Sequence, residues 1–237
     1  MINRLPAMTA VLCLAVSGCG STTAGTAMPS APIPPTNAQT LPALLLSAPE
    51  VADALGGGEL VVSGEVDAPW NDATHFQGAG EAGCLAIAGA AQKGVYADAG
   101  WAALHGQVLR EPPTARSWSH FVTQAVVLFG DAAAASGFLR AQRQSWSGCS
   151  DRELRYTQSM APDSLAPDQV WAVGPTLADR DLLTVSRVQR SPQHWFCQRA
   201  LTVHANVGVD VEACSLGGPT SAAAAIAGRI GDRLPSA

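Results

Sequence analysis

The 237-residue sequence predicts an α+β domain in which an antiparallel β-sheet packs against helices. The clearest evidence is the segment 195–214, where every odd position from Leu201 to Ala213 is apolar and polar residues take most even positions. Such alternation is typical of a half-buried antiparallel sheet. The segment 131–148 instead carries apolar residues at helical spacing. Strands and helices do not alternate regularly, which argues against a parallel βαβ sheet.

Residues with strong local preferences mark the ends of the expected elements. Ser47 caps a helix that has Pro49 in its first turn, and Pro112-Pro113 separates two long strands, as suits an antiparallel pair. In chain order we expect a helix over 48–55, a strand over 59–66, a loop over 67–83, a helix over 84–98, strands over 101–110 and 118–129, a helix over 131–147, a strand over 154–158, a hairpin of 169–173 with 182–189, strand structure over 195–214 and a final helix from Thr220 or Ser221.

The first 18 residues have the form of a signal peptide. Arg4 precedes a largely apolar stretch over 7–16, which is far shorter than the ~20 residues that a membrane span requires. The segment Val16-Ser17-Gly18-Cys19 then resembles a lipobox, in which small residues admit the signal peptidase and the Cys19 thiol receives a diacylglyceryl group. We therefore expect Cys19 to be lipidated and to anchor the protein. The alternative is an ordinary signal peptide that leaves Cys19 unmodified.

The segment 19–43 is expected to be the lipidated Cys followed by a disordered tether. From Gly20 to Pro42 it is rich in Pro, Ser, Thr and Ala and lacks aromatic and charged residues, so nothing offsets the entropy of ordering it. The remaining stretch, 44–237, has a normal length for one domain with its own core. These features predict a protein on the extracytoplasmic face of the cell membrane, held there by its lipid.

The charge balance argues against nucleic acid as a partner. Arg4 is lost with the signal peptide, which leaves 13 of the 14 Lys and Arg residues against 19 Asp and Glu residues, a net charge near −6. A nucleic-acid-binding domain would need a clustered basic face.

Four of the six cysteines are expected to form two disulfides. Cys13 leaves with the signal peptide and Cys19 is lipidated, and an even number of remaining cysteines in an exported domain favours disulfides. The alternative to two disulfides is a zinc site, but the sequence contains no Cys-x-x-Cys spacing. The remaining cysteines are Cys84, Cys149, Cys197 and Cys214.

The pairing follows from the geometry of the last strand region. In one straight strand Cys197 and Cys214 would lie roughly 56 Å apart, whereas a chain reversal near Ala205-Asn206 makes them neighbours across a hairpin. The simple register of that hairpin sets apolar residues opposite polar ones, so we expect a β-bulge, at Gly208, to restore two consistent faces. The pairs favoured by this geometry are Cys197–Cys214 and, by elimination, Cys84–Cys149.

Three sequence segments carry a resemblance to a known family. They are FVTQAV at 121–126, QRQSWSGC at 142–149, and the stretch from CQRAL at 197–201 to DVEAC at 210–214. Together they resemble the PknH-type extracellular sensor domain of mycobacteria, which occurs on a receptor serine/threonine kinase and as free-standing lipoproteins. The match covers most of residues 44–234. Its Trp-Ser-Gly-Cys segment and closing cysteine pair are fairly specific.

The resemblance implies an antiparallel sheet with helices, the two disulfides paired as above, and a deep central cleft that binds an unidentified ligand. The kinase also has a kinase domain and a transmembrane helix, and neither occurs in this sequence. The resemblance therefore implies ligand binding, or work with a partner, rather than direct signal transmission.

The sequence contains no motif of a known catalytic class. It lacks a Gly-x-Ser-x-Gly elbow, a His-Glu-x-x-His motif, a Ser-x-x-Lys motif and a phosphate-binding Gly loop. Its five histidines are scattered, and no pair has metal-ligand spacing on one element. We therefore expect no enzyme activity, no cofactor and no metal. The alternative is a serine triad that assembles only in three dimensions.

The expected ligand site combines aromatic, basic and amide side chains. Aromatic faces suit lipid or sugar ligands, and Arg199 could fix an anionic head group. The alternatives are core packing for the tryptophans, above all Trp146, and a solvated surface for Arg199. The polar residues at even positions of 202–212 form either a solvated sheet face or one wall of the cleft. The candidate ligand-binding residues are Trp118, His120, Gln124, Trp195, Arg199 and His204.

Three functions are compatible with the sequence. The leading hypothesis is a sensor-type envelope lipoprotein that binds an unidentified small lipid or glycan, which predicts a pocket of apolar side chains with a few polar ones. The second is a module that docks on an envelope protein, which predicts an exposed apolar patch and no deep cavity. The third is a hydrolase, which requires a Ser or Asp within hydrogen-bond reach of a His.

Overall fold

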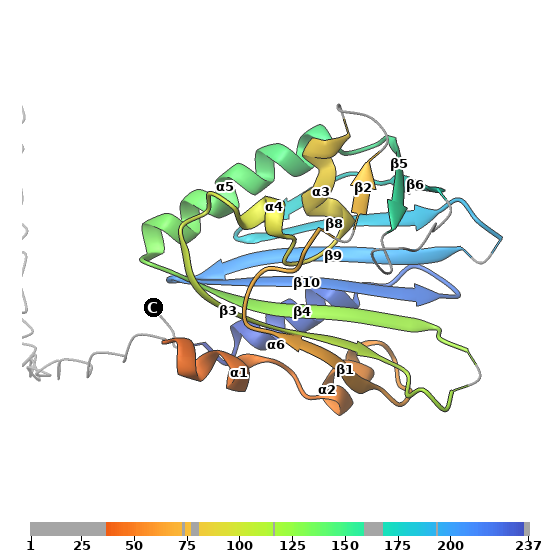
Figure 1. The fold of residues 1–237 in the computed structure, drawn as a ribbon, viewed down its shortest axis with the longest axis horizontal. Coiled ribbons are helices and arrows are strands. Elements are labelled where there is room, and N and C mark those ends of the chain that lie inside the picture. Colours follow the sequence, from red (N-terminus) through yellow and green to blue (C-terminus); the bar gives the residue numbers. More distant parts are fainter. Residues whose placement is uncertain are drawn as a thin grey trace, which may run out of the picture. The chain divides into compact units, whose positions relative to one another are not determined.

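The computed structural model describes residues 37–72, 74–76, 81–115, 117–158, 168–192 and 194–234. Within these residues all strands join one antiparallel sheet with helices on both faces (Figure 1). The strand order is β1–β3–β4–β10–β9–β8–β6–β5–β2, and β7 also pairs with β8. This architecture confirms the predicted α+β class.

The ten strands are β1 (Val61–Val66), β2 (Thr74–Phe76), β3 (Trp101–Arg110), β4 (His120–Phe129), β5 (Glu153–Gln158), β6 (Asp168–Val173), β7 (Leu177–Asp179), β8 (Leu182–Gln189), β9 (Trp195–His204) and β10 (Val207–Leu216) among the described residues. The helical segments are η1 (Ala38–Thr40), α1 (Leu41–Leu44), α2 (Ala48–Ala54), η2 (Ala82–Cys84), α3 (Leu85–Ala88), α4 (Lys93–Tyr96), α5 (Ala132–Gly148) and α6 (Ala222–Gly231). Most expected elements are present, but the short strands β2 and β7 were not predicted.

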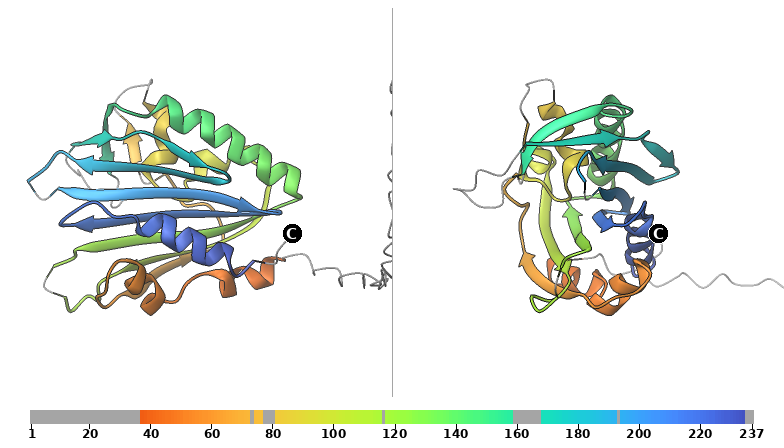
Figure 2. Two further views of the ribbon diagram at one scale, coloured as in Figure 1. Left: turned by 180° about the vertical axis from the view of Figure 1, so that it is seen from behind. Right: turned by 90° about the vertical axis from the view of Figure 1, so that its right-hand side faces the viewer.

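Each face of the sheet has its own hydrophobic core. On one face α5 packs through residues such as Phe138 and Trp146, and α3 and α4 lie beside it. On the other face α6 and the two N-terminal helices cover β4, β10 and β9, where Val209 and Val211 are fully buried. The view from behind in Figure 2 shows α6 lying across β9 and β10. The central strands are therefore enclosed between two helical layers.

The expectation of a half-buried sheet is wrong for β9 and β10. The hairpin turns at Ala205-Asn206 as predicted, but its register runs without a shift from Val207 opposite His204 to Leu216 opposite Trp195. No bulge occurs at Gly208. Because directly opposed residues share a face, apolar Leu201 and polar Asp210 point to the same side. Both sides are buried, so the polar residues are inside the protein.

The predicted helix over 84–98 is broken into α3 and α4. Gly89 is extended and Ala91 has a positive φ of 51°, so the helix cannot continue between them. The Ala91 amide donates to the Asp210 carboxylate at 2.8 Å, and Trp70 forms a parallel bridge with Gln92. Tertiary hydrogen bonds thus outweigh the helix propensity of this Ala-rich stretch.

The folded domain begins at least as early as residue 37, not at 44. The predicted tether included residues 37–43, but η1 and α1 lie there and Leu41 is only 1% exposed. Asn37 caps η1 through its side chain, which accepts from the Gln39 amide. The earlier part of the predicted tether, Cys19 and the signal peptide lie outside the described residues. Within the described part of the chain, no helix is both long and apolar enough to span a membrane.

Candidate functional site

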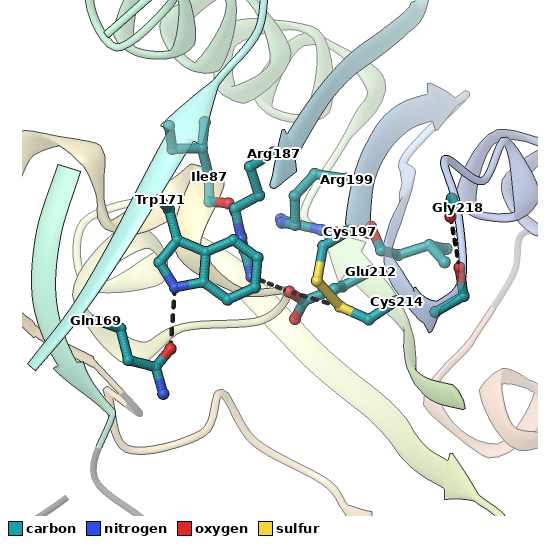
Figure 3. Close-up of a disulfide and its surroundings, with 11 residues drawn as sticks. Ile87, Gln169, Trp171, Arg187, Cys197, Arg199, Glu212, Cys214 and Gly218 are labelled. Carbon is teal, nitrogen blue, oxygen red and sulfur yellow. Dashed lines mark hydrogen bonds and ion pairs between the residues drawn. A yellow bond between two sulfur atoms is a disulfide. The ribbon is translucent and has the colours of Figure 1, made fainter. Parts of the chain in front are cut away.

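The centre of the α5 face holds an ion pair between Arg187 and Glu212. Both side chains are 7% exposed, and the guanidinium also donates to the Ile87 carbonyl (Figure 3). Trp171 stacks on the guanidinium at 4.8 Å from its ring centroid, and its indole N–H donates to Gln169 at 2.9 Å. The Arg187 Nε atom is buried and has no partner. Strands β8, β10 and β6 thus bring one cation, one anion and one aromatic ring together.

A second buried ion pair lies next to the first. Arg199 contacts Asp210 at 2.6 Å, with both side chains 3% exposed, and its guanidinium donates to the Ala86 carbonyl. The other Asp210 oxygen accepts from the Tyr96 hydroxyl at 3.0 Å. Burial, followed by the charge of Asp210, raises the pKa of Tyr96 well above its usual value of 10.0. Tyr96 therefore remains a hydrogen-bond donor.

Together the two pairs attach the α3–α4 segment to the sheet. The arginines bind the carbonyls of Ala86 and Ile87, while Asp210 binds the Ala91 amide and the Tyr96 hydroxyl. Breaking a buried ion pair costs more than the pair contributes, because the remaining charge has no water to solvate it. The cluster therefore fixes the position of this segment strongly.

The Cys197–Cys214 disulfide lies beside the first ion pair, and Cys84–Cys149 ties η2 to the end of α5. These are the two predicted pairings. Glu212 is two residues from Cys214 on β10, and its carboxylate oxygen lies 3.7 Å from the Cys214 sulfur. On β8, Arg187 is directly opposite Cys197. The disulfide therefore has one cationic and one anionic neighbour (Figure 3).

A polar cluster stands where β3 and β4 meet. The Glu111 carboxylate accepts from the Ser119 hydroxyl at 2.6 Å and lies 2.8 Å from His120 Nδ1. Ser119 Oγ also lies 3.1 Å from the same nitrogen. A Ser–His–acid triad needs serine and carboxylate on opposite ring nitrogens. Here both face Nδ1, so this cluster lacks the geometry of a triad.

The Glu111 cluster predicts a specific loss of stability in acid. Burial by itself raises the pKa of Glu111, but hydrogen bonds from Ser119 and His120 outweigh it and lower the pKa from 4.5 to about 2. The contribution of Glu111 to stability is therefore complete above pH 4.5 and is lost as the pH falls towards 2. Between about pH 5 and about pH 2, urea unfolding should show that the free energy of unfolding falls less in Glu111→Gln than in the wild type.

Part of the acid dependence should persist in that variant. Hydrogen bonds from Ser47 also lower the pKa of Glu50 to about 2. Identical pH profiles for the wild type and Glu111→Gln would contradict the assignment to Glu111.

A hollow of about 290 Å³ lies beside the start of α6. Its apolar residues come from β6, β8, β9 and the β10–α6 connection, and Ser186 and Thr220 add two hydroxyl groups. Figure 2, left, shows no helix over β6 and β8 on this face, where α6 covers β9 and β10 instead. The apolar residues of the hollow are Ala172, Val173, Val188, Phe196 and Pro219.

The six predicted ligand-binding residues do not form one site. Gln124 is fully buried against the α6 face and binds both backbone groups of Leu46, whereas Arg199 lies on the α5 face. His204 is exposed at the β9–β10 turn. Trp118, His120 and Trp195 lie near one end of β4 and β9, but none of them lines the hollow.

Two of these side chains have partners that explain their positions. Trp118 is 43% exposed and stacks on Arg110, whose guanidinium carbon lies 4.3 Å from the ring centroid. His120 is held by Glu111.

Arg187 and Tyr96 were not singled out from the sequence, and Asp210 and Glu212 were assigned either to a solvated face or to a cleft wall. A signal for these buried charges was nevertheless present. The simple hairpin register sets Arg199 directly opposite Glu212, which places opposite charges side by side. In that register apolar residues lie opposite polar ones. This mismatch indicates that both faces of the hairpin are buried, and it does not require a bulge.

The fold and site define an α+β domain held together by two disulfides and two buried ion pairs, and comparison with known proteins gives its family. A family model described as "PknH-like extracellular domain" matches residues 36–233. The chain therefore belongs to the family of PknH-like extracellular domains, as the sequence resemblance indicated.

Solved and curated relatives agree with this assignment. The crystal structure of the extracellular domain of PknH from Mycobacterium tuberculosis is similar with a TM-score of 0.74 and 28% identity, covering 84% of this chain and 96% of that one. The serine/threonine-protein kinases PknH of Mycobacterium bovis and M. tuberculosis are 28% identical over 224 residues, 94% of this chain. The chain spans 36% and 34% of their lengths, about a third.

Proposed function

We propose that this protein is a lipid-anchored envelope protein whose extracytoplasmic domain captures a small, largely apolar ligand. The observation that carries the proposal is the hollow beside α6. Ligand sites are typically concave and lined by apolar side chains with a few polar groups, and the hollow has this composition. Its volume of about 290 Å³ suits a small ligand or the end of a lipid chain.

Two independent features support the extracytoplasmic location and the anchor. The family is defined by an extracellular domain, and two disulfides persist in oxidising compartments. The lipobox-like segment before Cys19 supports lipidation at that residue. Because the matched kinases are about three times longer, their kinase activity is not transferred to this chain. A role in signalling would require a partner protein.

One experiment tests both the anchor and ligand capture. The full chain is purified in mild detergent from a mycobacterial host and analysed by native and denaturing mass spectrometry. The denatured chain is expected to start at Cys19 with acyl groups attached, and the native chain to carry one further small molecule. Val188→Trp fills the hollow and should lower ligand occupancy at least about tenfold.

The matched control is Leu177→Trp. Leu177 is 62% exposed on β7 and does not line the hollow, so this variant should retain the ligand. A wild-type chain that stays empty after incubation with envelope extract would exclude tight capture.

Docking on an envelope protein is the second candidate, and the exposure of Leu177 favours it. All three residues of β7 are exposed, and Leu177 is among the most exposed large apolar side chains of the described residues. Contiguous exposed apolar patches mark interaction surfaces, so a docking partner would have to contact Leu177 together with its neighbours on the surface. An empty hollow together with loss of partner capture in Leu177→Asp would favour docking over ligand binding.

A further inference from the structure

We propose that reduction of the Cys197–Cys214 disulfide creates a binding site for a soft divalent cation such as Zn²⁺, with both thiolates and the Glu212 carboxylate as ligands. Glu212 and Cys214 are two residues apart on β10, so both side chains point to the α5 face. Cys197 on β9 is directly opposite Cys214 and shares that face. The sheet therefore presents three ligands from two adjacent strands on one side.

The distances between these groups suit one metal ion. One ligand atom from each of the three residues lies within 4.8 Å of the others, and all three residues are buried. In a tetrahedral zinc site with thiolate and carboxylate ligands, neighbouring ligand atoms are roughly 3.5–4 Å apart. Opening the disulfide would let the two sulfurs separate towards this spacing. A water molecule would complete the coordination.

The redox state controls the site because thiolates, not disulfide sulfurs, bind such metals well. Two molecules of a small thiol reduce the bridge: each gives up one proton and one electron to a cysteine sulfur, and the two small thiols join as their own disulfide. On metal binding the two cysteine thiols release their protons to water. Cys197 and Cys214 are buried on the α5 face, at 3% and 5% exposure, so the reducing thiol must be small.

The surrounding charges are compatible with both states. In the disulfide state the Glu212 carboxylate is balanced by Arg187. With metal bound, two thiolates and one carboxylate are balanced by a divalent cation and the same guanidinium. Glu212 Oε1 both accepts from Arg187 and lies near the Cys214 sulfur, so a metal ion bound through Oε2 would leave the Arg187 hydrogen bond in place. Such outer contacts orient metal ligands. The buried cluster is neutral in either case, which limits the cost of desolvation.

The second disulfide provides an internal control. Among the residues that the structure describes, the group formed by Cys197, Glu212 and Cys214 is the one that combines three potential metal ligands. In the described part of the chain no carboxylate joins Cys84 and Cys149 in such a group, so their thiols should bind the ion much more weakly.

The first test measures protection of each cysteine. The full chain is reduced with a phosphine, and the alkylation rate of each thiol is followed by mass spectrometry with and without Zn²⁺, while circular dichroism checks the fold. Zn²⁺ should slow alkylation of Cys197 and Cys214 at least about tenfold and leave Cys84 and Cys149 unchanged. Glu212→Gln should remove most of the protection. Equal effects on all four cysteines, or none, would overturn the proposal.

A second test does not require the reduced chain to remain folded. The reduced, unfolded chain is refolded in air with and without excess Zn²⁺, and the closing of each bridge is timed. Zn²⁺ bound by the two β9–β10 cysteines should slow formation of the Cys197–Cys214 disulfide at least about tenfold relative to formation of Cys84–Cys149. Unchanged relative rates of closure would contradict the proposed site.

Discussion

Replacing Asp210 with alanine is expected to lower the free energy of unfolding by about 3–5 kcal/mol, because the Arg199 guanidinium remains buried without its carboxylate. The substitution also removes the acceptor for the Ala91 amide and the Tyr96 hydroxyl. Urea unfolding of the full chain, followed by tryptophan fluorescence, gives the change in free energy.

Asp53→Ala is the matched control for this prediction. Asp53 is 70% exposed and pairs with Arg229 at the surface, so its removal should cost only about 0–1 kcal/mol. The double variant Arg199→Met/Asp210→Leu removes both charges and should be more stable than Asp210→Ala alone. If Asp210→Ala were as stable as the wild type, the Arg199–Asp210 ion pair would not be buried as described.

Removing the Cys84–Cys149 disulfide is expected to destabilise the domain by about 4 kcal/mol. In the loop-entropy model, the stabilisation grows with the length of the closed loop, and this bridge has a sequence separation of 65 residues. Cys197–Cys214 has a separation of 17 residues and should contribute about 3 kcal/mol. The two double alanine variants, compared by urea unfolding without reductant, check both the size and the order of the effects. The reverse order would contradict the loop-entropy account.

The sequence predicted the elements whose patterns are local. The periodicity of α5, with Asp131 as its cap, and the turn at Ala205-Asn206 are both present in the structure. The cysteine pairs followed from the chain reversal between Cys197 and Cys214. These features depend on spacing along the chain and on short-range geometry, which the sequence contains directly.

The candidate site could not be predicted in the same way. Trp118, Gln124 and Arg199 were grouped by their chemistry, but the sheet separates Gln124 and Arg199 onto opposite faces. An alternating strand has one polar side whether that side meets water or a second helical layer. The pattern alone therefore does not distinguish a solvated carboxylate from a buried one.

By itself the sequence determined the α+β class, the family and the disulfide pairing, because capping residues, periodicity and cysteine positions act locally or constrain the chain strongly. Only the tertiary structure decided that both faces of β9 and β10 are covered, that Asp210 and Glu212 are buried with arginines, and that the Ala-rich helix breaks at Gly89. These outcomes depend on which distant segments pack on the sheet. A buried charge is stable only where its partner comes from another strand, and that proximity is a property of the fold.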